Sequence, residues 1–211
     1  MAITTHGSLA AKAVAHFEGS GDIVPRSRGD ALEIRRQSER LRQWAKDTGH
    51  LIDYTPPAGA PESRGAEHEV FFHQQDDRVF KRTHPGTFGS VLTERGLRRV
   101  ATPYFYLLRL ELVNQVFGSD LRLEGVTRSD KPSIVISQPW AHPADLRCPL
   151  PSSTEIWEFM TSLGFDPIPD APFDWLRKSE GLRVSDARPD NFIKTAEGVV
   201  PIDLVICRIE N

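Results

Sequence analysis

The 211-residue sequence has only two cysteines, and it has no apolar run close to the roughly 20 residues that span a bilayer. Two cysteines, Cys148 and Cys207, are too few for a disulfide framework or a zinc site, which favours a reducing compartment. No basic segment followed by an apolar block opens the chain, so a secretion signal is not expected. These absences predict a cytoplasmic protein without a membrane partner.

An excess of charge of one sign is also missing. The 26 lysines and arginines nearly balance the 29 aspartates and glutamates, so the composition does not predict nucleic-acid binding. Arg95, Arg98 and Arg99 form a dense basic cluster, but no aromatic residues are interleaved with them. Single strands of nucleic acid usually stack on such aromatic residues, so this cluster does not change the expectation.

The first third of the chain predicts a helix followed by a hairpin. Residues 1–28 have little periodicity and are expected to form a tail or a partly ordered packing segment. Asp30 is placed to cap a helix that runs to about Asp47. Residues 69–73 and 78–82 are runs of β-forming residues on either side of a polar turn, which predicts an antiparallel hairpin.

The middle of the chain predicts a long helix and two more strands. A short helix is expected somewhere within residues 84–100. Thr102, as a capping residue, and Pro103, at the first helical position, then begin a strong helix that ends at Gly118. Residues 121–127 and 133–137 are apolar enough to form strands.

The last third predicts helices, a loop and a final hairpin. Ser152 and Glu155 have the spacing of a capping box, which predicts a helix through Leu163. A second, short helix is expected over residues 173–179. The hairpin is expected from residues 192–194 and 199–205. This order predicts an α+β fold with two lobes, a small antiparallel sheet in the first lobe and a reduced second lobe.

A constellation of polar residues lies near the end of the chain. Asp186 is followed by a basic residue, Arg188, and by Asn191, and Asp203 lies further on in an apolar run that reads as a strand. Phosphoryl transfer to a hydroxyl needs a carboxylate for the hydroxyl proton, a cation for the phosphate, and oxygen ligands for Mg²⁺. The same residue types are also common in ordinary turns, so this stretch alone would not indicate chemistry.

A second set of residues is expected in the first lobe. Lys81 lies on the strand predicted over residues 78–82, where its ammonium group could bridge nucleotide phosphates. Glu111 is expected to pair with it, and Glu94 is the alternative. Gln138 follows an apolar strand at the point where backbone groups of a hinge could contact adenine. Alone, each of these residues is more often structural; together with the C-terminal motif they favour function.

At this point the sequence resembles the protein-kinase-like superfamily. More narrowly, it is similar to the kinase domain found in polyvalent proteins of phages and mobile elements. The resemblance covers roughly residues 40–205. Besides the two C-terminal motifs, it rests on Trp44-Ala45-Lys46-Asp47, on Glu67-His68-Glu69-Val70, on the segment from Val79 to Gly89, on Asn114-Gln115-Val116-Phe117-Gly118 and on Ile136-Ser137-Gln138-Pro139.

The resemblance implies ATP- and Mg²⁺-dependent phosphotransfer in a bilobal fold. It implies an N-lobe over residues 29–138, and a hinge and minimal C-lobe with the catalytic loop over residues 139–211. The partners implied are a nucleotide and a protein acceptor. The roles implied for individual residues are Asp186 as catalytic base, Arg188 in the position of the catalytic-loop lysine, Asn191 and Asp203 as metal ligands, and Lys81 as the phosphate-binding lysine.

Several departures from the kinase pattern favour an alternative. The sequence has no G-x-G-x-x-G loop, and Gly65 in Ser63-Arg64-Gly65-Ala66 is the best candidate for a degenerate one. Val184-Ser185 replaces the usual His-Arg, and Leu204-Val205 replaces Phe-Gly. No activation segment follows Asp203, so a peptide-substrate platform of the usual kind is not expected. The alternative function is a catalytically inactive module that binds a nucleotide or a protein.

Overall fold

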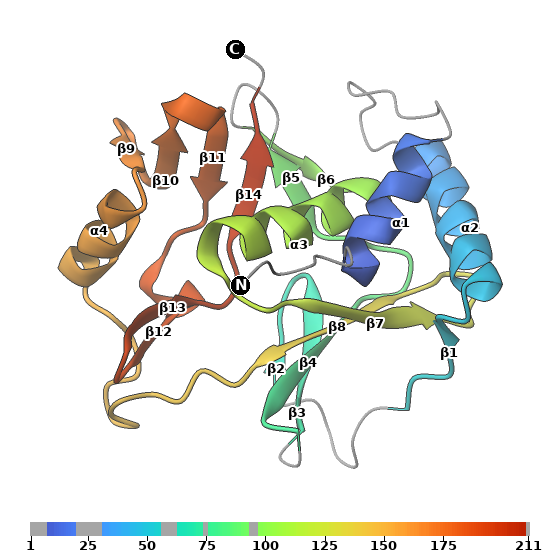
Figure 1. Cartoon of the computed structure of the whole chain (residues 1–211), viewed down its shortest axis with the longest axis horizontal. Helices are drawn as coiled ribbons and strands as arrows, with labels where there is room; N and C mark the ends of the chain where they lie inside the picture. Colours follow the sequence, from blue (N-terminus) through green and yellow to red (C-terminus); the bar gives the residue numbers. More distant parts are fainter. Residues whose placement is uncertain (1–7, 20–30, 56–62, 74–75, 93–96, 210–211) are drawn as a thin grey trace, which may run out of the picture. The chain divides into compact units, whose positions relative to one another are not determined.

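The computed structural model describes residues 8–19, 31–55, 63–73, 76–92 and 97–209. It confirms a mixed α+β fold with several antiparallel sheets (Figure 1). The helices are α1 (Leu9–Glu18), α2 (Ala31–Asp47), α3 (Pro103–Phe117) and α4 (Ser153–Ser162). None of the helices in the described ranges has both the length and the apolar character needed to cross a membrane.

The chain divides into two compact units. Unit 1 consists of residues 1–91, 99–111 and 120–139, and unit 2 consists of residues 92–98, 112–119 and 140–211. Each unit has its own sheet and its own buried residues. The first part of α3 therefore belongs to unit 1 and its last turns belong to unit 2.

Unit 1 is built on a six-stranded sheet with the order β1-β7-β8-β4-β3-β2. Its strands are β1 (Leu51–Ile52), β2 (Ser63–Arg64), β3 (His68–His73), β4 (Arg78–Thr83), β7 (Arg122–Thr127) and β8 (Ile134–Pro139). All neighbours are antiparallel except β1 and β7, which are parallel. The predicted hairpin of β3 and β4 and the predicted strands β7 and β8 are confirmed.

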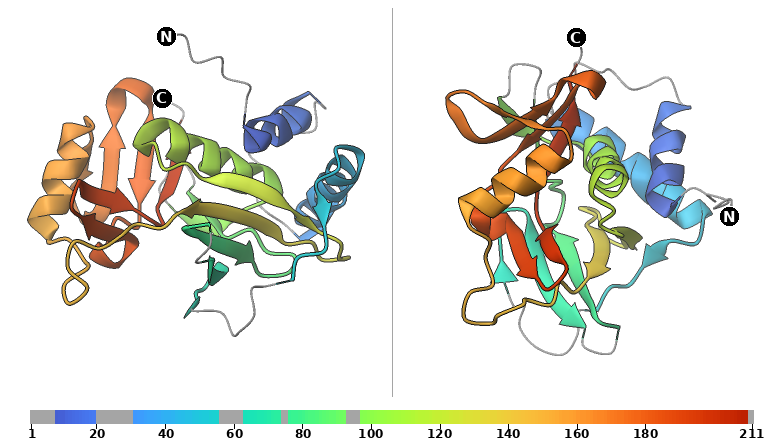
Figure 2. Two further views of the ribbon diagram at one scale, coloured as in Figure 1. Left: turned by 60° about the horizontal axis from the view of Figure 1, so that its bottom comes forward. Right: turned by 60° about the vertical axis from the view of Figure 1, so that its left-hand side comes forward.

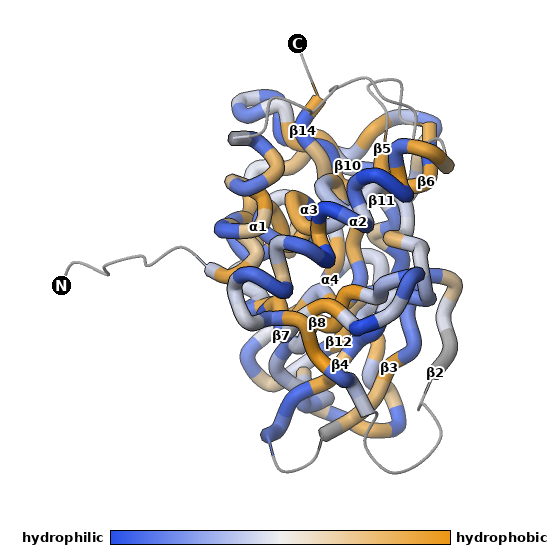
Figure 3. Tube along the Cα trace, turned by 90° about the vertical axis from the view of Figure 1, so that its right-hand side faces the viewer, coloured by the Kyte–Doolittle hydropathy of each residue, from blue (hydrophilic) through white to orange (hydrophobic). Residues whose placement is uncertain are grey.

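Helices α1 and α2 both pack against β7 in unit 1. Helix α1 lies within the segment expected to be a tail or a packing segment, and it buries Val14 and Phe17. The Arg40 guanidinium of α2 lies 5.8 Å from the centre of the Phe17 ring. Figure 3 shows α2 as mostly hydrophilic and the start of β8 as hydrophobic. This difference in composition matches their burial, since α2 buries one narrow stripe and β8 is buried on both faces.

The start of α3 differs from the prediction in its capping contact. The helix begins at Pro103 as expected, but the Thr102 hydroxyl is buried and has no hydrogen-bond partner among the described residues. Instead, the Tyr104 amide donates to Oε1 of Gln37, on α2, at 3.2 Å. A side chain from a distant helix therefore satisfies a donor that the Thr102 hydroxyl was expected to satisfy.

The prediction of a short helix within residues 84–100 was wrong for the described part of this segment. The chain forms two short paired strands, β5 (Ser90–Leu92) and β6 (Arg98–Val100). Gly86 and Gly89 have φ angles of 72° and 69°, which lie outside the helical region. Two left-handed residues so close together rule out a continuous helix here.

Unit 2 contains a four-stranded antiparallel sheet with the order β14-β11-β10-β9, and a separate hairpin of β12 and β13. The strands are β9 (Asp166–Ile168), β10 (Ala171–Arg177), β11 (Leu182–Ser185), β12 (Phe192–Thr195), β13 (Gly198–Pro201) and β14 (Val205–Arg208). In both views of Figure 2, α4 lies beside the β12–β13 hairpin, and Lys194 of β12 forms an ion pair with Glu155 of α4. The predicted capping box of Ser152 and Glu155 is confirmed.

Two expectations for unit 2 were wrong. Residues 173–179 form the end of β10 and a 3-10 turn instead of a helix, with Trp175 paired opposite Val184 of β11. Pairing with β11 overrides a weak helical pattern that contains β-favouring aromatic residues. The strand expected over residues 199–205 is also interrupted: β13 ends at Pro201, and Asp203 lies in a bend before β14 rather than on a strand.

Candidate functional site

In unit 2, Asp186 lies on the turn that links β11 to β12. Its φ angle is 65°, in the left-handed region that Asp and Asn tolerate better than most residues because their short side chains bond locally. The amide of Ala187 donates to the carbonyl oxygen of Phe173 at 3.0 Å, which ties the turn to β10. The Asp186 carboxylate is thus presented directly after a buried strand end.

Asn191 closes this turn with both its side chain and its backbone. Its Nδ2 donates to the carbonyl oxygen of Asp186 at 2.7 Å, and its amide donates to the carbonyl oxygen of Arg188 at 2.9 Å. The carbonyl oxygen of Asn191 accepts from the amide of Ile202 at 2.9 Å, one residue before Asp203. The motif from Asp186 to Asn191 and the bend with Asp203 therefore belong to one hydrogen-bonded assembly.

The Asp186 carboxylate is held by two arginines. Nε of Arg188 lies 2.9 Å from Oδ1, and Nη2 of Arg98 lies 3.0 Å from Oδ2. Arg188 also reaches Asp190 at 3.4 Å. No sequence motif predicted a role for Arg98 at this turn, and its membership of a basic cluster was the only available signal. Arg95, from the same cluster, lies outside the described residues.

The arrangement around Asn191 fits the ligand role implied for it. Because Nδ2 bonds the Asp186 carbonyl, Oδ1 is the amide atom left for a cation, and oxygen is the ligand that Mg²⁺ prefers. Asp203 adds an exposed carboxylate. No group of three or more His, Cys, Asp or Glu side chains in the described ranges could hold a metal ion. An Mg²⁺ ion bound here would need phosphate oxygens and water to complete its coordination.

In unit 1, Lys81 and Gln138 lie on the same face of the sheet. Lys81 is paired opposite Ile136, and Val79 is paired opposite Gln138. Side chains alternate along a strand, so Lys81, Val79 and their partners all point to one side. Both Lys81 and Gln138 are only 7% exposed. The two polar side chains are therefore buried on the same face of the sheet as Val79 and Ile136.

Gly65 lies in the turn between β2 and β3. Its amide donates to the carbonyl oxygen of His68 at 2.9 Å, and its carbonyl oxygen accepts from Nε2 of His84 at 2.9 Å. The candidate phosphate loop is thus a tight hairpin turn, next to the strand that pairs with the Lys81 strand.

Glu111 contacts a residue other than the one predicted. Its carboxylate accepts a hydrogen bond from the hydroxyl of Ser8, the residue that caps α1. The pairing of Glu111 with Lys81 stays a prediction, and the alternative residue, Glu94, lies outside the described residues.

The ion pair that α3 makes with the β2–β3 turn uses Arg109. Its guanidinium binds the Glu67 carboxylate, with Nη1 at 3.1 Å from Oε2, and it lies 5.0 Å from the centre of the Tyr106 ring. Nε2 of His68 is 2.8 Å from the Tyr106 hydroxyl and 3.3 Å from Glu67. The Arg109 side chain is 7% exposed, so this is a buried polar cluster. No motif or spacing in the sequence predicted that these residues would come together.

A family comparison covers nearly all of these residues. The model of the serine/threonine/tyrosine kinase found in polyvalent proteins matches residues 35–211. The chain belongs to this family. No curated protein matches the chain. The candidate residues of both units lie inside the matched range, which confirms the resemblance stated from the sequence.

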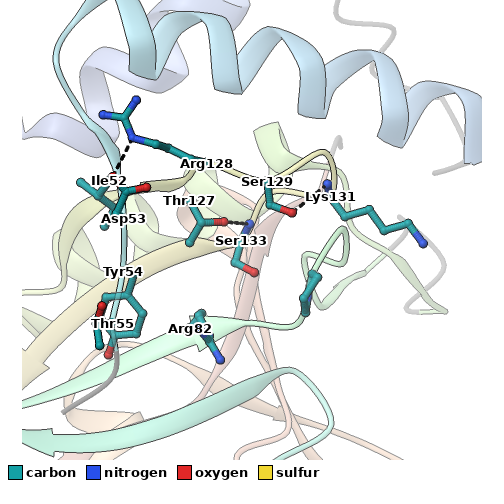
Figure 4. Close-up of a pocket in the computed structure, with 11 residues that line it drawn as sticks. Ile52, Asp53, Tyr54, Thr55, Arg82, Thr127, Arg128, Ser129, Lys131 and Ser133 are labelled. Atoms are coloured by element: carbon teal, nitrogen blue, oxygen red, sulfur yellow. Dashed lines mark hydrogen bonds and ion pairs between the residues drawn. The ribbon is translucent and has the colours of Figure 1, made fainter. Parts of the chain in front are cut away.

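This kinase-family chain also has a polar hollow of about 400 Å³ in unit 1 (Figure 4). Arg82 lines it, and because Arg82 follows Lys81 on β4, the two side chains point to opposite faces of the sheet. Arg82 is paired with Glu69, and Figure 4 shows Arg128 turned toward Asp53, its partner at 3.1 Å. Both arginines of this hollow are therefore already paired with carboxylates.

Proposed function

We propose that this protein is an ATP- and Mg²⁺-dependent phosphotransferase of the kinase type that acts on a hydroxyl group, with a protein as the acceptor class. The observation that carries the proposal is a pair of hydrogen bonds made by Asn191. Its side-chain amide donates to the Asp186 carbonyl, and its backbone carbonyl accepts from the amide of Ile202, the residue before Asp203. These contacts keep a carboxylate, an amide and a second carboxylate together in unit 2. Membership of the kinase family supports the same assignment.

Within unit 2, Asp186 orients the acceptor hydroxyl and takes its proton. Arg188 contacts the phosphoryl group, and Asn191 and Asp203 hold Mg²⁺. ATP, when bound, supplies the phosphoryl group, and the metal neutralises charge on its oxygens. Asp186 has to be correctly oriented, and the hydrogen bonds that its backbone carbonyl accepts from Asn191 and Arg188 serve that purpose.

Within unit 1, Lys81 contacts the nucleotide phosphates and Glu111 supports it. Gln138 contributes to adenine recognition, and the turn at Gly65 lies near the phosphates. The placement of Lys81 and Gln138 supports these roles, because both side chains are buried on the same face of the paired strands β4 and β8.

The second candidate function is an inactive kinase-like module that binds a nucleotide or a protein. One observation favours it: each oxygen of the Asp186 carboxylate already has an arginine within 3.0 Å. A general base has to offer one oxygen to the acceptor, so an active enzyme must release one of these contacts.

The test compares three variants in an assay of ATP consumption and autophosphorylation. Asp186→Asn should leave ATP affinity nearly unchanged and remove turnover, because the carboxylate acts on the acceptor. Lys81→Ala should weaken ATP binding. Asp170→Asn is the matched control, since Asp170 is also a left-handed residue of unit 2, with φ of 64°, but lies in the β9–β10 turn.

Turnover that is equally fast in wild type and Asp186→Asn would exclude Asp186 as the base. ATP binding without turnover, in the presence of candidate protein acceptors, would favour the inactive module. The absence of any ATP binding by the wild-type protein would reject both nucleotide-dependent functions.

A further inference from the structure

Arg98 contacts Asp186, although it belongs to none of the kinase-like sequence motifs. It lies at the start of β6, and the Asp186 motif lies 88 positions further along the chain (186 − 98). Nevertheless, Nη2 of Arg98 is 3.0 Å from Oδ2 of Asp186, within unit 2. Arg188 holds the other oxygen at 2.9 Å, so two guanidinium groups flank one carboxylate.

The Arg98 contact can be exchanged for another. The Arg98 side chain is 49% exposed, and ion pairs between exposed groups contribute little net stability. Guanidinium groups bind carboxylate and phosphate oxygens with the same planar, two-donor geometry. A phosphate group near Asp186 would therefore compete with the carboxylate for Arg98.

We propose that Arg98 is a second phosphate-contacting residue of this site, which binds the transferring phosphoryl group together with Arg188. The inference rests on the proposed phosphotransferase function. It assigns two states to Arg98: it holds Oδ2 of Asp186 in the empty protein, and it binds phosphoryl oxygens when ATP is present. The exchange leaves Oδ2 of Asp186 available for the acceptor hydroxyl.

The proposed step transfers the terminal phosphoryl group of ATP to the acceptor hydroxyl. The acceptor oxygen forms a bond to phosphorus while the bond between phosphorus and the ADP oxygen breaks, and ADP leaves with that electron pair. The acceptor proton passes to Asp186. Negative charge is spread over the phosphoryl oxygens during transfer, and a guanidinium aimed at those oxygens stabilises it.

The test is a comparison of ATP and ADP affinity, because it needs no acceptor. Isothermal titration calorimetry would give the dissociation constants of Mg²⁺–ATP and Mg²⁺–ADP for the wild type and three variants. Arg98→Ala should weaken ATP binding by about tenfold, roughly the loss of one charge-assisted hydrogen bond, and leave ADP binding unchanged. Arg98→Lys should recover part of the loss, because it keeps the charge but not the two-donor geometry.

Arg99→Ala is the matched control, since Arg99 is exposed on the same strand and should leave both affinities unchanged. The proposal is overturned if Arg98→Ala has the same ratio of ATP to ADP affinity as the wild type. This holds whether both affinities are unchanged or both fall equally, which would indicate a general effect. Either outcome leaves the phosphotransferase function standing. A wild-type protein that binds neither nucleotide would reject the proposed function, and this inference with it.

Discussion

The two units hold their candidate residues by different physical means. In unit 1, Lys81 and Gln138 are buried on paired strands of a six-stranded sheet. In unit 2, Asp186 and Arg188 lie on a turn, partly or largely exposed, and backbone hydrogen bonds around Asn191 hold them in place. Substitutions in unit 1 should therefore disturb folding and binding together, whereas those in the turn should separate chemistry from stability.

The largest effect is expected from the buried ion pair of unit 1. Arg109→Met would leave the Glu67 carboxylate, which is 16% exposed, without its guanidinium partner. We expect a loss of about 3–5 kcal/mol in the free energy of unfolding, the usual effect of orphaning a buried charge. Urea unfolding would measure it. Arg35→Met, which breaks an exposed pair with Glu39 on α2, is the control and should cost less than about 1 kcal/mol.

A loss of less than about 1 kcal/mol for Arg109→Met would mean that the buried ion pair of unit 1 contributes no more to stability than an exposed ion pair does. Glu67→Gln combined with Arg109→Met should recover part of the stability, because the double variant no longer buries an unpaired charge.

A smaller effect is expected from the turn of unit 2. Asn191→Ala removes the bond from Nδ2 to the Asp186 carbonyl, and the Asn191 side chain is buried. We expect a loss of about 0.5–1.5 kcal/mol, the usual net contribution of one hydrogen bond, because the Arg188 amide still donates to the Asp186 carbonyl. Amide hydrogen exchange should speed up around Asp186 and Ile202 and stay unchanged in β3 and β4. Uniform acceleration across both units would contradict a local role for Asn191.

The smallest effect concerns the exposed contact between α4 and β12. The Lys194 ammonium, 2.5 Å from the Glu155 carboxylate, together with hydrogen bonds from the Ser152 amide and hydroxyl, lowers the pKa of Glu155 to about 2. A carboxyl with a lowered folded-state pKa contributes stability above its unfolded pKa, and this is lost as pH falls toward 2. A carbon NMR titration of the Glu155 carboxyl should show the low pKa, and Lys194→Met should raise it. Lys178→Met, on the 3-10 turn, should not.

The parts of the fold that sequence predicted correctly are local. The α4 capping box and the β3–β4 hairpin each involve residues a few positions apart, where spacing alone carries the signal. The contacts that it missed join distant residues. Gln37 bonds Tyr104 across 67 positions, and Arg109 bonds Glu67 across 42. No periodicity encodes such pairs, because tertiary packing selects them.

The two wrong helices have a related cause. Both segments, residues 84–100 and 173–179, lack a strong helical stripe. In the described part of the first, residues 90–92 and 98–100 pair with each other, and in the second, the end of β10 pairs with β11. Gly86 and Gly89 adopt left-handed φ angles. Two glycines this close together were the available indication against a helix, because glycine destabilises a helix interior. For Phe173 and Trp175, aromatic content was the available indication of a strand.

The left-handed backbone of Asp186 also has an evolutionary consequence. Glycine adopts this conformation without the steric cost that a side chain brings, and asparagine, like aspartate, tolerates it. Mutational drift at this position is therefore biased toward glycine and asparagine wherever the carboxylate is not needed. Under the proposed function, lineages of this family that abandon phosphotransfer should lose the aspartate early and keep a well-folded turn, and the residue at this one position would then record which lineages retained catalysis.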